Sequence, residues 1–220
     1  MKRWPVVLLL ALAASSSPRA AGVPEASGKV LLIIRDAKVT APAALELMIT
    51  KEAGVMKAML EDAGYGVEIA SPTGEPWGTA TLALKPDRKL SEVDVAAYVA
   101  FVIPCLGIES EALHPDLAAV ITAAVAKGKP VAAQNGGVLM LAKAGVLSGK
   151  HYSAQVPLHL PELEGGIHSG RDIVKDGGIL TSGTCPWMAR EDPNTVDGTS
   201  KLTAALIAEL RPPTLHIQNQ

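Results

Sequence analysis

Short apolar runs alternate with longer amphipathic stretches along most of the chain. The runs are rich in small and β-branched residues, which is typical of strands buried on both faces of a parallel sheet. They cover residues 29–34, 67–70, 99–103, 129–134 and 179–181. Because strands that alternate with helices form βαβ units, the pattern predicts an α/β fold. We expect a doubly wound, mostly parallel sheet with helices on both faces and a ligand site at the carboxyl ends of the strands.

Four stretches have the spacing of amphipathic helices, and the first contains an unusual residue. The helices are predicted over residues 43–63, 115–126, 136–144 and 199–210. In the first, apolar residues recur every three or four positions up to Gly64, but Glu52 falls on this apolar stripe between Met48 and Met56. Glu52 either lies at the edge of a wide stripe or is a buried carboxylate with a partner, which would make it a site residue.

The sequence around Asn135 predicts a sharp turn between a strand and a helix. The apolar run that ends at Gln134 is followed by Asn135, Gly136 and Gly137, and a helical pattern then begins. Such a turn lifts the side chain of Asn135 out of the strand end and directs the free N–H groups of the next helix at a ligand. Asn tolerates the left-handed backbone region that the turn needs, but its carboxamide is not a nucleophile at neutral pH.

Composition indicates one domain and argues against several kinds of ligand. The 220 residues are 48% hydrophobic with a net charge of −2, which suits one well-packed domain, predicted over residues 29–211. No lysine or arginine run is present, so nucleic acid is not an expected partner. The five histidines lack ligand spacing and no glycine-rich phosphate loop is found, so we expect neither a metal site nor a cofactor.

The amino terminus has the pattern of a secretory signal peptide. Lys2 and Arg3 precede an apolar run from Val6 to Ala14, and small residues follow. We predict a signal peptide over residues 1–21, a linker over 22–28 and a tail over 212–220. The apolar run is short for a membrane span, so we expect a periplasmic or secreted protein that has no membrane association after cleavage.

Several motifs, taken in order, resemble the ThiJ/PfpI superfamily, the Parkinsonism-associated deglycase group within the class I glutamine amidotransferase-like fold, which is flavodoxin-like. The matching segments are Val30 to Ile34, Ala63-Gly64 with Val67 to Pro72, Pro104 to Gly107, Val131 to Gly137, Ala144 to Lys150 and Asp176 to Ser182. The resemblance covers nearly all of the chain after the signal peptide. It implies the fold more specifically than it implies an activity.

The resemblance also implies which residues form the site. Family members carry a cysteine at the strand-to-helix turn, the elbow, and a glutamate from the first helix bonds to it. The glutamate position falls on Glu52, whereas Asn135 takes the place of the cysteine, and Ala154 takes that of a histidine found in some members. Thiolate chemistry at the elbow is therefore not expected. Glu52 could instead bond to the Asn135 side chain and leave N–H groups near Gly136 and Leu106 for a ligand.

The two cysteines leave three alternatives open. By the topology that the resemblance implies, the strand end at Cys105 and the loop at Cys185 lie on the same rim. In an oxidising compartment they could form a disulfide, worth roughly 4–5 kcal/mol by chain entropy. They could also be inert buried thiols, or one of them could be a displaced nucleophile with a lowered pKa.

Three functions follow from these observations. The first is binding of a small carbonyl or carboxylate compound by Asn135, Gly136 and Gly137 together with Cys105, Leu106 and Gly107. The second is a hydrolase, hydratase or glyoxalase-like enzyme that uses Cys185 or Cys105 with Glu52. The third is a structural or partner-binding protein, and a homodimer is the assembly that the resemblance implies.

Overall fold

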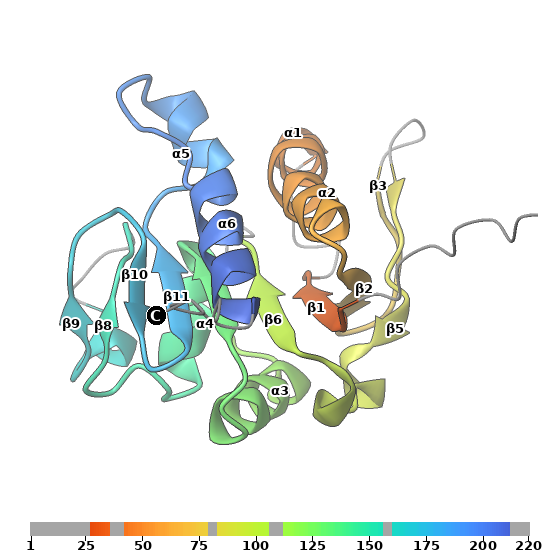
Figure 1. The fold of residues 1–220 in the computed structure, drawn as a ribbon. Coiled ribbons are helices and arrows are strands. Elements are labelled where there is room, and N and C mark those ends of the chain that lie inside the picture. Colours follow the sequence, from red (N-terminus) through yellow and green to blue (C-terminus); the bar gives the residue numbers. More distant parts are fainter. Residues whose placement is uncertain (1–26, 36–41, 79–82, 106–111, 156–159, 212–220) are drawn as a thin grey trace, which may run out of the picture.

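A central sheet of seven strands organises the computed structural model, which describes residues 27–35, 42–78, 83–105, 112–155 and 160–211 (Figure 1). The strand order is β10-β11-β7-β6-β1-β2-β5, and every pairing is parallel except that of β10 with β11. The strands are β1 (Lys29–Ile33), β2 (Gly66–Ser71), β5 (Arg88–Lys89), β6 (Ala100–Ile103), β7 (Val131–Gln134), β10 (Val174–Asp176) and β11 (Ile179–Ser182). The predicted fold class, an α/β protein with a mostly parallel sheet, is confirmed.

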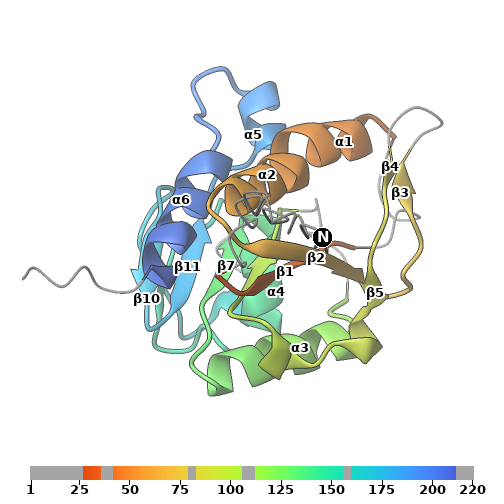
Figure 2. The same ribbon diagram turned by 45° about the vertical axis from the view of Figure 1, so that its right-hand side comes forward.

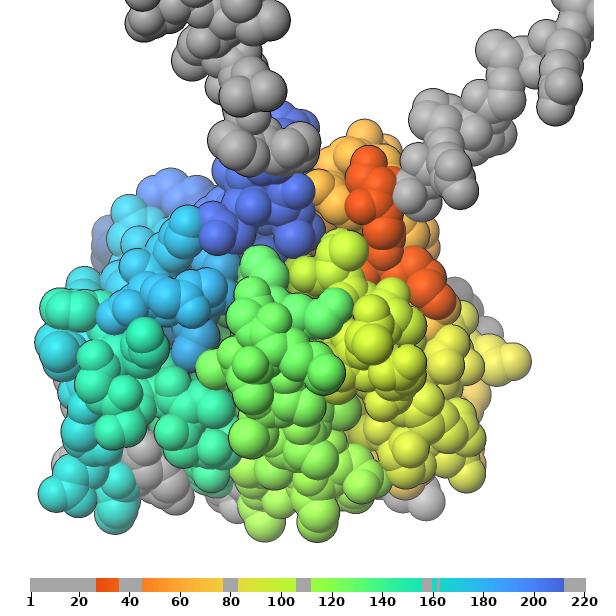
Figure 3. Space-filling model, turned by 60° about the horizontal axis from the view of Figure 1, so that its bottom comes forward, coloured from red at the N-terminus to blue at the C-terminus, as the bar shows by residue number. Residues whose placement is uncertain are grey.

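Helices cover both faces of this sheet. Helices α1 (Pro42–Leu47), α2 (Gly54–Asp62) and α6 (Thr199–Leu210) lie on one face, and α3 (Pro115–Ala126) and α4 (Gly136–Lys143) lie on the other (Figure 2). Seen from below, α3 occupies the middle of its face, between residues that precede β6 and residues beyond α4 (Figure 3). The central strands β1, β6, β7 and β11 are almost wholly buried between these layers, as their continuous apolar sequences predict.

Several short elements were not expected from the sequence. They are β3 (Trp77–Gly78), β4 (Ala83–Leu84), β8 (His151–Tyr152), β9 (Ile167–His168), α5 (Pro186–Glu191) and the 3-10 turns Leu90–Glu92, Val95–Ala97 and Pro161–Leu163. Strands of two residues have no periodicity to detect, so pairing with a neighbour defines them. The segment between β2 and β6 therefore contains the β3–β4 pair and the edge strand β5.

The helix predicted over residues 43–63 is divided into three parts. Between α1 and α2 lies a π-helical segment, η2 (Met48–Ala53), in which the N–H of Gly54 donates to the carbonyl of Ile49, five residues earlier. A Cβ atom on Gly54 would lie 2.2 Å from that carbonyl oxygen. The segment therefore requires glycine at this position. Wider turns of this kind occur often at functional sites.

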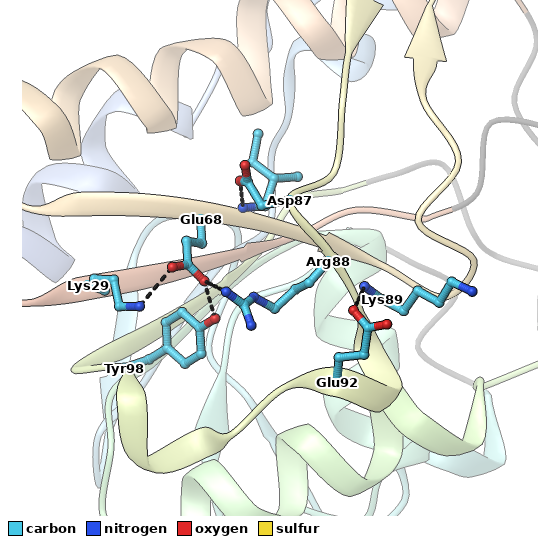
Figure 4. A network of polar contacts seen from close by, with 8 residues as sticks. Lys29, Glu68, Asp87, Arg88, Lys89, Glu92 and Tyr98 are labelled. Atoms are coloured by element: carbon cyan, nitrogen blue, oxygen red, sulfur yellow. Dashed lines mark hydrogen bonds and ion pairs between the residues drawn. The ribbon is translucent and has the colours of Figure 1, made fainter.

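A polar network centred on β2 joins the strands near the β5 edge of the sheet (Figure 4). The Glu68 carboxylate accepts hydrogen bonds from Lys29 Nζ at 2.7 Å and Tyr98 Oη at 2.5 Å, and Arg88 lies 2.6 Å away. Although burial acts to raise the pKa of Glu68, the bonds from Lys29 and Tyr98 and the charge of Arg88 lower it below its usual value. The network ties β1, β2 and β5 to the segment before β6.

The predicted signal peptide, most of the linker and the tail lie outside the described residues. Among the residues that are described, no helix has the length and apolar character needed to span a membrane.

Candidate functional site

Asn135 forms a strained turn between β7 and α4, as the sequence predicts. It is the one non-glycine residue with positive φ in the described part of the chain, at φ 38° and ψ −97°. Its N–H donates to the Ser182 carbonyl of β11 at 2.7 Å, and its own carbonyl accepts from Val138 at 2.9 Å. A conformation of this kind costs about 1–3 kcal/mol and is held by its surroundings.

Gly137 brings the start of α4 against the end of β6. A Cβ atom at this position would lie 2.3 Å from the Ile103 carbonyl oxygen and 2.8 Å from that of Pro104. Since both contacts are with backbone atoms, a larger residue would push the helix away from the strand. The close approach places Cys105, which follows β6, beside Asn135.

Glu52 points from the π-helical segment into this region and is 1% exposed. Its Oε1 accepts a hydrogen bond from the Cys105 N–H at 2.6 Å. Burial raises the pKa of Glu52 well above its usual value, the nearby Cys105 and Asp197 raise it further, and the bond from the Cys105 N–H lowers it. The environment therefore favours the protonated carboxyl, which can donate as well as accept a hydrogen bond.

The amide of Asn135 has partners at both ends and is 6% exposed. Its Nδ2 donates to Cys105 Sγ at 3.7 Å, and its Oδ1 accepts from the Gln155 N–H at 3.0 Å. The direct bond that we expected between Glu52 and Asn135 does not form. Cys105 lies between the two residues instead, because its N–H reaches Glu52 while its side chain reaches Asn135.

The two cysteines are buried thiols that lie together and are not joined by a disulfide. A hydrogen bond with Cys105 and burial raise the pKa of Cys185 far above its usual value, and the charges of Cys105 and Glu52 act in the same direction. The two thiols therefore lie close to each other inside the protein. A raised pKa leaves little thiolate on Cys185, which disfavours this thiol as a nucleophile.

Other polar residues of the site were missed by the sequence analysis. Gln134 Nε2 donates to the Thr184 carbonyl at 2.6 Å and to Thr199 Oγ1 at 3.1 Å, and Thr199 donates to Asp197 at 2.7 Å. Gln134 is a polar residue at the end of a buried strand, and that signal could have identified it. Asp197 had no such signal, since it stands in a polar loop before α6.

Two candidates, Leu106 and Gly107, lie outside the described residues. Within the ranges that the structure describes, no group of three or more His, Cys, Asp or Glu side chains could hold a metal ion. The candidates Glu52, Asn135, Cys105 and Cys185 are brought together, with Gly136 and Gly137 in the first turn of α4.

The sequence pattern of the DJ-1/PfpI family matches residues 37–189, which is most of the chain. The chain belongs to the DJ-1/PfpI family. No match is found among curated protein sequences.

Solved structures of family members have the same fold. A two-domain protein of Anabaena variabilis with DJ-1/ThiJ/PfpI-like and ferritin-like domains is 21% identical, with a TM-score of 0.61. The match covers 83% of this chain and 48% of the Anabaena protein, so this chain spans about half the length of that protein. A putative protease I of Bacteroides thetaiotaomicron is 17% identical, with a TM-score of 0.60 and coverage of 84% and 99%. Drosophila melanogaster DJ-1beta is 22% identical, with a TM-score of 0.57 and coverage of 83% and 95%.

Within the DJ-1/PfpI fold, the elbow of this chain carries a neutral amide. Asn135 holds its backbone in the positive φ region, and Glu52 approaches the elbow through Cys105. These similarities to solved structures concern the fold, and the chemistry of the site depends on the residues of this chain.

Proposed function

We propose that this DJ-1/PfpI family member binds a small carbonyl or carboxylate compound at the carboxyl ends of β6 and β7. The observation that carries the proposal is the amide of Asn135, which stands at the elbow beside the first turn of α4. An amide in this position supplies hydrogen bonds and no nucleophile.

The groups around the elbow are mainly hydrogen-bond donors. The N–H groups of Gly136 and Gly137 begin α4, and neither reaches a backbone acceptor among the residues described. Asn135 Nδ2 carries a second hydrogen besides the one directed at Cys105 Sγ. Donors at a helix amino terminus complement an oxygen with partial or full negative charge, because the helix dipole adds to their hydrogen bonds.

Glu52 is consistent with the same class of ligand. A carboxylate facing a negatively charged ligand would repel it, but the raised pKa of Glu52 favours the neutral form. A protonated carboxyl can donate one further hydrogen bond to a ligand oxygen. The site is thereby suited to binding an oxygen-rich compound without a net positive charge.

Asn135→Asp tests this proposal with little change in shape. The substitution replaces an N–H donor by a carboxylate oxygen, so affinity for acetate and pyruvate should fall at least about tenfold, or 1.4 kcal/mol. Binding is measured by saturation-transfer NMR with these two probes. Asn194→Asp, in an exposed turn, is the matched control and should bind as the wild type does. Equal binding by both variants, or no binding of either probe to the wild type, would refute the proposal.

A second candidate is an enzyme that uses Cys105 with Glu52. It is favoured by the position of Cys105, whose N–H bonds to Glu52 and whose Sγ contacts Asn135. A hydrolase, hydratase or glyoxalase-like reaction would require a thiol with a lowered pKa. Labelling of the native protein with a thiol reagent over a pH series separates the candidates: rapid reaction of Cys105 below neutral pH supports the enzyme, and slow reaction at every pH supports binding alone.

Export and a homodimer complete the proposal. The basic residues and apolar run before Ala14 support cleavage of a signal peptide, which amino-terminal sequencing of the protein from cell fractions would test. Light scattering of the purified protein would establish the oligomeric state.

A further inference from the structure

Asn135 and Gly136 form the one Asn-Gly pair in the chain. In this dipeptide the side-chain carboxamide can react with the next backbone nitrogen, because glycine has no Cβ atom to block the approach. The product is a five-membered cyclic imide. Asn-Gly pairs are typical of two-residue β-hairpin turns, whereas this one is held in a buried elbow.

The backbone of Asn135 turns the attacking nitrogen toward the side of its own Cβ atom. In a helix ψ is about −42° and in an antiparallel strand about +135°, and both values turn the following nitrogen away from Cβ. At the observed ψ of −97° the Gly136 nitrogen comes close to eclipsing the Asn135 Cβ. A five-membered imide needs this arrangement, because its ring atoms are nearly coplanar. The elbow therefore holds the backbone torsion of the product before any reaction occurs.

The Gly136 nitrogen, which would attack, takes no part in the hydrogen bonds of α4. Gly136 is the first residue of α4, and no hydrogen bond of its N–H is found with the described residues. The helical bonds begin with Val138, which donates to the Asn135 carbonyl. Attack by the Gly136 nitrogen would therefore break no helical hydrogen bond.

The carboxamide is held by a donor at the atom where charge would develop. The Gln155 N–H lies 3.0 Å from Asn135 Oδ1. When the Gly136 nitrogen adds to Cγ, negative charge builds on Oδ1, and a fixed N–H stabilises it in a buried site. Nδ2, the leaving nitrogen, is directed at Cys105 Sγ on the opposite side.

We propose that Asn135 and Gly136 are an autocatalytic modification site that converts the elbow asparagine into an acidic residue. The Gly136 nitrogen forms a bond to Asn135 Cγ, the Cγ–Nδ2 bond breaks, and the proton lost by the Gly136 nitrogen leaves with Nδ2 as ammonia. Water then adds to a carbonyl of the imide, opens the ring and gives aspartate or isoaspartate. The balance is one water consumed and one ammonia released, without an oxidant or a cofactor.

The modification would change the chemistry of the elbow. A neutral donor would become a carboxyl beside Cys105, in a region that already contains Glu52 and Asp197. A carboxyl at an elbow can act as a base or a nucleophile, which an amide cannot. This inference does not depend on ligand binding, because the reaction uses only residues of the chain itself.

The experiment compares the folded and the unfolded chain. Freshly purified wild-type protein is incubated in oxygen-18 water at mildly alkaline pH, with and without concentrated urea, and the peptide that contains residue 135 is followed by mass spectrometry. Because the elbow fixes the backbone torsion of Asn135 and the hydrogen bonds of its carboxamide, label should enter at residue 135 at least about tenfold faster in the folded protein than in urea. Asn194, in an exposed turn, is the internal control and should incorporate no more label when folded than when unfolded.

A folded-state rate equal to or below the rate in urea would overturn the proposal, since the fold would then protect the amide. Gly136→Ala tests the chemistry separately and should slow label incorporation in both states, because a Cβ atom hinders the nitrogen. If this variant does not fold, its rate in urea still tests the imide route, and the wild-type comparison decides whether the fold accelerates it.

Discussion

Gly54→Ala tests whether the π-helical segment is what aims Glu52 at the site. Gly54 follows this segment, and its N–H bonds to the Ile49 carbonyl. An added Cβ would lie 2.2 Å from that oxygen, whereas real Cβ atoms almost never approach other atoms within 3.0 Å. The carbonyl would have to move by about 0.8 Å, which the five-residue turn cannot allow without changing its hydrogen bond.

The expected loss of stability is the balance of three terms. Alanine is favoured over glycine in a helix by about 0.8–1.0 kcal/mol. Forcing a methyl group into a filled space costs about 1–3 kcal/mol. If the turn reverts to a regular helix and Glu52 rotates away, its bond to the Cys105 N–H is also lost, which removes about 0.5–1.5 kcal/mol. The net result is destabilisation of about 2 kcal/mol.

Two measurements detect the effect of Gly54→Ala on stability and on the position of Glu52. With a slope of about 2 kcal/mol per molar urea, the midpoint of urea unfolding should fall by about 1 M. The backbone amide resonance of Cys105 in a ¹H–¹⁵N correlation spectrum should shift as well, because this N–H loses its carboxyl acceptor. The spectrum reports on the site and the midpoint reports on the whole fold.

Thr50→Ala is the matched control, because Thr50 lies in the same segment with an exposed side chain. It also places alanine in the segment but makes no close contact, and it removes only an exposed hydroxyl that donates to the Glu46 carbonyl. Both the midpoint and the Cys105 resonance should therefore stay near their wild-type values. Gly54→Ala with wild-type stability and an unchanged Cys105 resonance would refute the view that the π-helical segment positions Glu52.

Three further predictions concern the carboxyls and the elbow. Because burial raises the native pKa of Glu52, the stability of the wild type should fall as pH rises from the usual carboxyl range through that pKa. In urea titrations at several pH values, Glu52→Gln should remove this fall. Glu46→Gln, at an exposed position, should not remove it. The pH dependence that Glu68 gives to stability has the opposite sign, because its native pKa is lowered. Its contribution to stability is present above the usual carboxyl range and is lost in acid. Glu68→Gln should therefore reduce the loss of stability at acid pH in the same titrations. Asn135→Cys should give a thiol that dilute peroxide oxidises readily, as mass spectrometry would detect, and an unreactive thiol would count against the elbow geometry.

Local pattern predicted the parts of this protein that repeat along the chain. The buried strands and the main helices have a pattern of apolar positions, and the turn at Asn135 has turn-forming residues, that are visible within about ten residues. Glu52 was also marked locally, because a carboxylate interrupts an apolar stripe. These features are determined by the sequence, since burial of a strand or a helix face depends on which positions along it are apolar.

Tertiary structure alone decided how these parts meet. Glu52 and Cys105 are 53 positions apart, and Cys105 and Asn135 are 30 apart, so their hydrogen bonds exist only after β6 and α4 have packed together. The same holds for the π-helical segment, which no spacing rule predicts, and for edge strands such as β5 that are too short to show a period. An interaction between distant positions leaves no local pattern, because its free energy comes from the packing of the elements that carry it.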